Sequence, residues 1–124
     1  MTKREILQSD NLPVPAAPYS VATIWGDLMF ISGQVPSDTS QDIEGQTEQV
    51  MEKLKAIMAE AGTGFEHALK ATCFLTDVSE FARFNEVYKR YVGEDKPARS
   101  TVECKLAGPG FKVEVDMIVG IPRD

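Results

Sequence analysis

A chain of 124 residues in which 43% of the side chains are apolar can build one hydrophobic core without disulfide bonds or metal ions. Its 13 basic and 19 acidic residues give a net charge of −6, which argues against nonspecific nucleic-acid binding because that binding depends on a basic surface. The two isolated cysteines and the single histidine do not supply an ordinary zinc site, so we expect no metal.

The first 20 residues contain no apolar segment of the kind that marks a secretory signal, and they lack the pattern of a transit peptide. No apolar run in the sequence approaches the length that spans a bilayer. We therefore expect a cytoplasmic protein that has no membrane partner.

Residues 1–18 are polar and rich in proline, which favours an extended lead-in. Two β-favouring runs, SVATIW at 20–25 and LMFISGQV at 28–35, flank Gly26 and Asp27, and this pair predicts a two-residue hairpin turn. Gly33 interrupts the second run. It indicates either a β-bulge or a point where a ligand approaches the backbone.

A helix is predicted over residues 46–61, because apolar side chains recur there at helical spacing and Gly62 follows as a terminator. The run LKATCFLT then predicts a strand, and Ser79 is a candidate N-cap for a second helix. The apolar stripe of this second helix includes one amide, Asn85. A structural hydrogen bond explains that amide more readily than direct ligand contact does.

Near the C-terminus, two runs in which apolar and polar residues alternate flank the turn-forming segment AGPG at 107–110. The predicted order is β-β-α-β-α-β-β, which suggests a single α+β domain over residues 1–124 with both helices on one face of one sheet. A hairpin of the last two strands would place Leu106 opposite Phe111. Glu103 would then lie opposite Glu114.

Alternation decides which residues of this hairpin share a face. Apolar side chains at even positions of the first strand and at odd positions of the second are expected to point to the core. The other face would then carry Arg99, Thr101, Glu103, Lys105, Lys112, Glu114 and Asp116, with Thr101 opposite Asp116. Ile118 and Ile24 would lie among these charges, and a face of this mixed character is often an oligomer interface.

Two interpretations of this polar face remain open. The face is either a solvated surface with ordinary ion pairs, or a site in which Arg99 grips a carboxylate through two parallel hydrogen bonds while an acid activates water. Repulsion between neighbouring carboxylates would raise the pKa of at least one of them, and Glu114 is the candidate.

Six short motifs are spread along the chain: APYS at 17–20, ISGQVP at 31–36, AG at 61–62, FNEVY at 84–88, PARSTVE at 97–103 and KVEVDM at 112–117. Their order and spacing resemble the RidA family, also called YjgF/YER057c/UK114, over residues 8–121. The resemblance implies a chorismate-mutase-like fold and a homotrimer with ligand clefts between subunits. It also implies hydrolysis of reactive enamines and imines, such as 2-aminoacrylate and 2-iminopropanoate, to 2-keto acids and ammonia, without a cofactor.

Matched residue by residue, the resemblance implies that Arg99 holds the substrate carboxylate and that Glu114 positions the attacking water. These two would be the catalytic residues. Once the carboxylate is fixed, the electrophilic imine carbon lies within reach of that water.

Four further residues are implied to bind the substrate. Tyr19 would line the cleft, Gly33 and Thr101 would contact the ligand through their backbones, and Asn85 would shape the site. For Tyr19 the residues alone leave a packing role equally open.

Three positions depart from the family pattern. Thr101 stands where many relatives carry cysteine, Ala17 replaces a glycine, and Asp116 replaces a glutamate. A ligand-binding regulatory or interaction protein without turnover is the alternative function. A ribonuclease or translation inhibitor, a label that many relatives carry, is disfavoured by the acidic composition.

Overall fold

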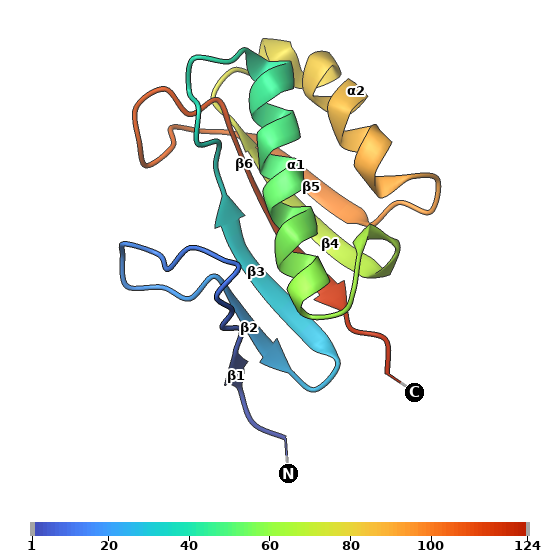
Figure 1. Cartoon of the computed structure of the whole chain (residues 1–124). Helices are drawn as coiled ribbons and strands as arrows, with labels where there is room; N and C mark the ends of the chain where they lie inside the picture. The colour runs from blue at the N-terminus through green and yellow to red at the C-terminus, as the bar shows by residue number, and fades with distance from the viewer. Residues whose placement is uncertain (1, 124) are drawn as a thin grey trace.

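The computed structural model describes residues 2–123 as one six-stranded sheet with two α-helices (Figure 1). The strands are β1 (Glu5–Ile6), β2 (Ala22–Trp25), β3 (Leu28–Gln34), β4 (Ala68–Leu75), β5 (Ala98–Glu103) and β6 (Val113–Gly120). The helices are α1 (Ile43–Glu60) and α2 (Phe81–Val92), with short 3₁₀ turns η1 (Phe65–His67) and η2 (Val78–Glu80). The predicted α+β class is confirmed, and β1 is a short addition within the expected lead-in.

The sheet is mixed and runs in the order β1-β2-β3-β6-β4-β5. Strands β4 and β5 are parallel, and the other neighbouring pairs are antiparallel. Both helices cover the same face of the sheet (Figure 1). The largest fully buried side chains lie between the layers and include Phe84, Met29, Ile43, Met51, Leu54 and Met58.

The first helix begins at Ile43, three residues before its predicted start. Asp42 causes this early start, because its carboxylate accepts the Gly45 N–H at 2.9 Å and satisfies one of the free donors of the first turn. Gly62 follows the helix with φ of +74°, a conformation that glycine adopts without strain, as the sequence predicted.

The prediction of Ser79 as the N-cap of the second helix is wrong. Ser79 lies inside η2, where the Asp77 carboxylate accepts both its backbone N–H at 2.9 Å and its hydroxyl at 2.7 Å. Helix α2 continues directly from this turn at Phe81. Asp77 therefore starts the turn, because its carboxylate is the stronger acceptor and stands two residues earlier.

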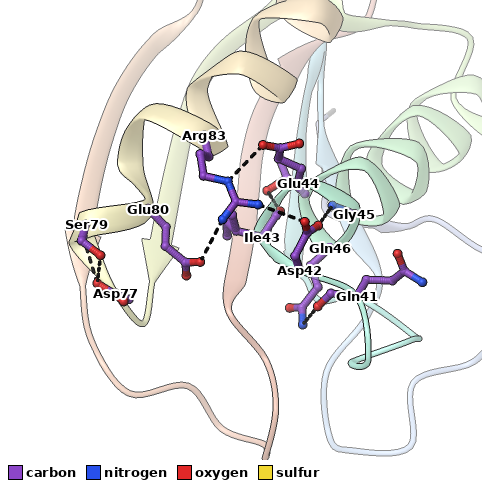
Figure 2. Close-up of polar contacts among 11 residues, drawn as sticks. Gln41, Asp42, Ile43, Glu44, Gly45, Gln46, Asp77, Ser79, Glu80 and Arg83 are labelled. Carbon is purple, nitrogen blue, oxygen red and sulfur yellow. Dashed lines mark hydrogen bonds and ion pairs between the residues drawn. The ribbon is translucent and has the colours of Figure 1, made fainter.

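Arg83 of α2 connects the two helices at their N-terminal ends (Figure 2). Its guanidinium donates to Glu44 at 3.0 Å and to Asp42 at 2.9 Å, and Glu80 lies 3.9 Å away. Arg83, Asp42 and Glu44 are exposed, so solvent screens the attraction between them. The network aligns the start of α2 with the capped start of α1.

Gln46 is a fully buried amide that joins two loops to α1. Its Nε2 donates to the carbonyls of Thr39, Gln41 and Gly110 at 3.0–3.2 Å, and its Oε1 accepts the Lys112 N–H at 2.8 Å. These bonds give the buried Gln46 amide the partners that a buried polar group requires. Gln46 thus fixes the loop from which β6 begins.

The first predicted hairpin is confirmed. Trp25 pairs with Leu28 across the two-residue turn, in which Gly26 has φ of +62°. The predicted irregularity at Gly33 is also confirmed, because the pairing of β3 with β6 shifts register between Ile31 and Gln34. Ile24 was expected on the open face but is buried on the helix-covered face.

The predicted hairpin of the last two strands is wrong. Strand β4 separates β5 from β6, so Leu106 does not face Phe111 and Glu103 does not face Glu114. Glu114 instead pairs with Phe74, and Asp116 pairs with Thr72 rather than with Thr101. The physical reason lies in the burial of the two strands: no residue of β6 is exposed, so β6 lies inside the sheet with a neighbour on each side, whereas β5 has exposed residues and lies at the edge.

Among residues 2–123, no helix is both long enough and apolar enough to cross a membrane.

Candidate functional site

Arg99 and Glu114 do not share a face of the sheet, contrary to the sequence prediction. In β5, Arg99 pairs with Ala71 and Thr101 pairs with Cys73, and both Ala71 and Cys73 are buried under the helices. Paired residues of neighbouring strands point to the same side. Arg99 and Thr101 therefore lie on the helix-covered face.

The Arg99 guanidinium is half-buried against α2. Its central carbon lies 4.8 Å from the ring centroid of Tyr88, 5.4 Å from that of Phe81 and 5.7 Å from that of Phe84. A cation within about 6 Å of an aromatic face is attracted by the ring electrons. Its Nη1 also donates to Asn85 Oδ1 at 2.8 Å, so five side chains form one unit.

All four partners of Arg99 come from successive turns of α2. Phe81, Phe84, Asn85 and Tyr88 follow the spacing that places side chains on one face of a helix. The structural hydrogen bond expected for Asn85 is present, and its donor comes from strand β5. The rings and the amide orient one edge of the guanidinium, and the remaining N–H donors are suited to an external anion.

Below this unit lies a buried thiol. Burial raises the pKa of Cys73 to about 12, against the opposing influence of the Arg99 charge, so the thiol stays protonated. Burial likewise raises the pKa of Tyr88 to about 12. Neither group is suited to act as a nucleophile at neutral pH.

Glu114 lies on the open face of the sheet and is half-buried. Its carboxylate lies directly against Gly33, and a Cβ atom at residue 33 would overlap Glu114 Oε2. Gly33 belongs to the bulge between β3 and β6. The bulge and the missing side chain together create the space that this carboxylate occupies.

The pKa of Glu114 is raised above its ordinary value, first by burial and then by the negative charge of Asp116 on the same face. The pKa of Asp116 is also raised by burial, although hydrogen bonds from Thr72 oppose the shift. The sequence predicted repulsion as the cause for Glu114, with Glu103 as its source. The structure gives burial as the main cause and Asp116 as the charged neighbour.

Tyr19 directly follows the lead-in segment and is 55% exposed. It borders a cavity of about 430 Å³ that is lined by residues of segments 6–15 and 19–21. Arg99, Asn85 and Glu114 do not line this cavity. Within one copy of the chain, the predicted site residues are thus divided among the Arg99 unit, the Glu114–Gly33 pair and Tyr19.

The open face carries large apolar side chains that one copy leaves exposed. Trp25 is 53% exposed, Phe30 is 42% exposed and Val102 is 46% exposed. Their strand partners place them on the same side as Glu114. Within residues 2–123, no group of three or more His, Cys, Asp or Glu side chains is arranged to hold a metal ion.

Sequence reasoning did not identify the aromatic rings around Arg99. The signal was present in the apolar stripe of the second predicted helix, which contains Phe81, Phe84 and Tyr88. The unusual amide at position 85 within that stripe was the clue that the helix face meets a polar partner.

Comparisons with known proteins give matches over almost the whole chain. Residues 9–121 match the family model described as Endoribonuclease L-PSP. The chain is 43% identical to Protein DfrA of Myxococcus xanthus (93% of this chain, 94% of that protein) and 40% identical to a RutC family protein of Pyrococcus horikoshii (93% and 96%). It is also similar to the crystal structure of RidA from an Antarctic Psychrobacter, with a TM-score of 0.86, 34% identity and coverage of 94% of this chain and 99% of that one. The fold, the dispersed motifs and these matches identify the chain as a member of the RidA/YjgF/L-PSP family.

Proposed function

We propose that this protein hydrolyses small reactive enamines and imines, of the 2-aminoacrylate and 2-iminopropanoate type, to 2-keto acids and ammonia without a cofactor. The observation that carries the proposal is the Arg99 unit. In it three aromatic rings and the Asn85 amide hold a half-buried guanidinium, whose other N–H donors are available to a ligand. A short organic acid is the ligand that such a group binds best.

Arg99 would anchor the substrate carboxylate, and this contact places the adjacent imine carbon. Glu114 would hold a water molecule against that carbon. The water oxygen forms a bond to the carbon as one of its protons passes to Glu114. Glu114 returns that proton to the nitrogen, whose double bond to carbon has become single, and a carbinolamine results. The hydroxyl proton of the carbinolamine then passes to the nitrogen through Glu114, the remaining carbon–nitrogen bond breaks, and ammonia leaves behind the carbonyl of the keto acid.

One copy of the chain holds Arg99 and Glu114 on opposite faces of its sheet, so we propose that each site combines Arg99 of one copy with Glu114 of another. A homotrimer with clefts between subunits satisfies this requirement. The exposed apolar side chains of the open face support it, because association would bury them.

The remaining site residues have proposed roles in the same cleft. Thr101 lies on the edge strand β5, where alternate backbone N–H groups point out of the sheet, and it would donate one of them to the ligand. Gly33 would contact the ligand through its backbone beside Glu114. Asn85 would hold Arg99 in place through its hydrogen bond, and Tyr19, which follows the lead-in segment, would line the cleft.

A ligand-binding regulator without turnover is the second candidate. It is favoured by the separation of the two groups within one copy, because Arg99 alone suffices to bind a keto acid. The family model bears a ribonuclease name, but the net charge of −6 argues against an RNA substrate.

A coupled assay tests the proposal. A serine or threonine dehydratase generates the imine, and release of the keto acid is followed with the wild type, with Arg99→Ala and with the surface control Arg90→Ala. We expect acceleration by the wild type and the control and none by Arg99→Ala. Equal rates with and without the wild-type protein would favour the regulator.

A further inference from the structure

Lys53 of α1 carries an ammonium group that is partly withdrawn from water and holds one backbone carbonyl. Its Nζ donates to the carbonyl of Val35 at 2.7 Å. The side chain is half-buried, and burial lowers the pKa of the amine because the charged form loses hydration there. Among residues 2–123, Lys53 makes no ion pair with a carboxylate. The hydrogen bond to Val35 is the contact that offsets the lost hydration.

Val35 directly follows β3, at the end where that strand carries its bulge. Gln34, the last residue of β3, pairs with the residue of β6 that comes after Glu114. One residue earlier in β3, Gly33 lies directly against the Glu114 carboxylate. Lys53 thus holds the backbone two residues away from the point where β3 meets this carboxylate.

The residue on the other side of Gly33 is fastened to the segment that leads into β2. The Ser32 hydroxyl donates to the carbonyl of Ser20 at 2.6 Å, and the Ser32 N–H donates to the next carbonyl along that segment at 3.0 Å. The Gln34 side chain donates back to the Ser32 carbonyl at 2.9 Å. A bulge interrupts the regular pairing of a sheet, so such contacts decide where its backbone lies. The Lys53 bond adds α1 to the elements that hold this bulge.

We propose that Lys53 is a positioning residue for the Glu114 carboxylate, which it places by anchoring the bulge of β3 to α1. While Val35 is tied to α1, the backbone of Gly33 stays against the carboxylate, which keeps its half-buried position. Without the anchor the bulge can move away, and Glu114 becomes more hydrated. The consequence for catalysis rests on the proposed function, whereas the effect on the position of Glu114 does not.

An NMR titration of the Glu114 carboxyl carbon tests the positioning without any assay of activity. Lys53→Met keeps most of the apolar stem and removes the amine, whereas Lys53→Arg keeps a charged donor. Burial is the main cause of the raised pKa of Glu114, so we expect this pKa to fall toward its ordinary value in Lys53→Met and to stay raised in Lys53→Arg. Loss of a nearby positive charge would by itself raise the pKa of a carboxyl group, so a fall is specific to the loss of burial.

Two further variants complete the titration. Lys53→Gln, whose amide ends one bond short of the Nζ position, should give the same fall and serves if Lys53→Met does not fold. Lys55→Met removes an exposed lysine from the same helix and should leave the pKa of Glu114 unchanged. An unchanged or raised pKa in the folded Lys53 variants, or an equal fall in Lys55→Met, would overturn the proposal.

The coupled dehydratase assay tests the consequence for catalysis. Lys53→Met should lower kcat about 10-fold and leave KM near its wild-type value, because Arg99 would still anchor the substrate. Lys53→Arg and Lys55→Met should keep the wild-type kcat. If the wild type is active, an unchanged kcat in Lys53→Met would overturn the role in catalysis. If the wild type is inactive, the proposed function fails, and the titration still decides whether Lys53 positions Glu114.

Discussion

Arg99 and Glu114 lie on opposite faces of one sheet, separated by the single strand β4. Arg99 points under the helices and is held by α2, whereas Glu114 points to the open face and rests against Gly33. Two groups in this relationship cannot act on one small molecule within a single copy of the chain. The proposed chemistry therefore requires that another copy complete the site.

Arg99→Lys should impair the proposed reaction although it keeps the charge. A lysine offers one compact ammonium in place of the planar fork that donates to Asn85 and to a carboxylate. Loss of one hydrogen bond to a charged group should lower kcat/KM by about 10- to 100-fold. The coupled dehydratase assay measures this, and full activity of Arg99→Lys would show that bidentate contact is not needed.

Gly33→Ala should displace the Glu114 carboxylate and lower kcat, while the protein stays folded. The new Cβ would overlap Oε2 at the end of a flexible side chain, which can move at little cost to the fold. Gly120→Ala is the matched control on β6, because a Cβ there would meet only the His67 carbonyl at an ordinary 3.5 Å. Equal activity of the two variants would mean that the position of Glu114 against Gly33 is irrelevant to turnover.

Asp116→Asn should move the acidic limb of the pH–rate profile to lower pH. Glu114 can accept a proton only when ionised, so activity should rise as the pH passes through its raised pKa. Removing the negative charge of Asp116 lowers that pKa, and the rise should begin earlier. The profile of kcat/KM against pH measures the shift, with the exposed Asp95→Asn as control. A shift to higher pH, or none, would exclude Asp116 as the source of the charge effect.

Gln46→Leu should destabilise the fold by about 1–3 kcal/mol, because it leaves three part-buried carbonyls and the Lys112 N–H without their partner. Denaturant unfolding measures the loss, and amide exchange at Lys112 should accelerate. The exposed Gln8→Leu provides the baseline. A loss no larger than that of Gln8→Leu would mean that solvent replaces these contacts.

Local signals in the sequence were sufficient for several elements. The 3.6-residue period of α1, the Gly26–Asp27 turn and the bulge at Gly33 each depend on neighbouring residues alone. The pairing of β5 was not accessible in this way, because alternation shows that two faces differ but not which one is the core. The open face is itself apolar, so the apolar Val102 was assigned to the core while Arg99 was placed outside.

The same limit applies to the candidate site. The sequence shows each residue of the Arg99 unit but not that they lie together. Arg99 reaches α2 only because β5 runs parallel to β4 beneath that helix. Parallel pairing across a helical crossover brings together residues far apart in sequence. Asp116 was visible on the same face as Glu114, yet the wrong hairpin register assigned its effect to Glu103.

Subunit complementation tests the shared site most directly. Arg99→Ala and Glu114→Gln are each expected to be inactive alone, and the two are refolded together as an equal mixture. In a trimer with sites between copies, about a quarter of the sites then combine an intact Arg99 with an intact Glu114. We predict recovery of about a quarter of the wild-type rate in the coupled assay, whereas a mixture no more active than its separate components would contradict the account.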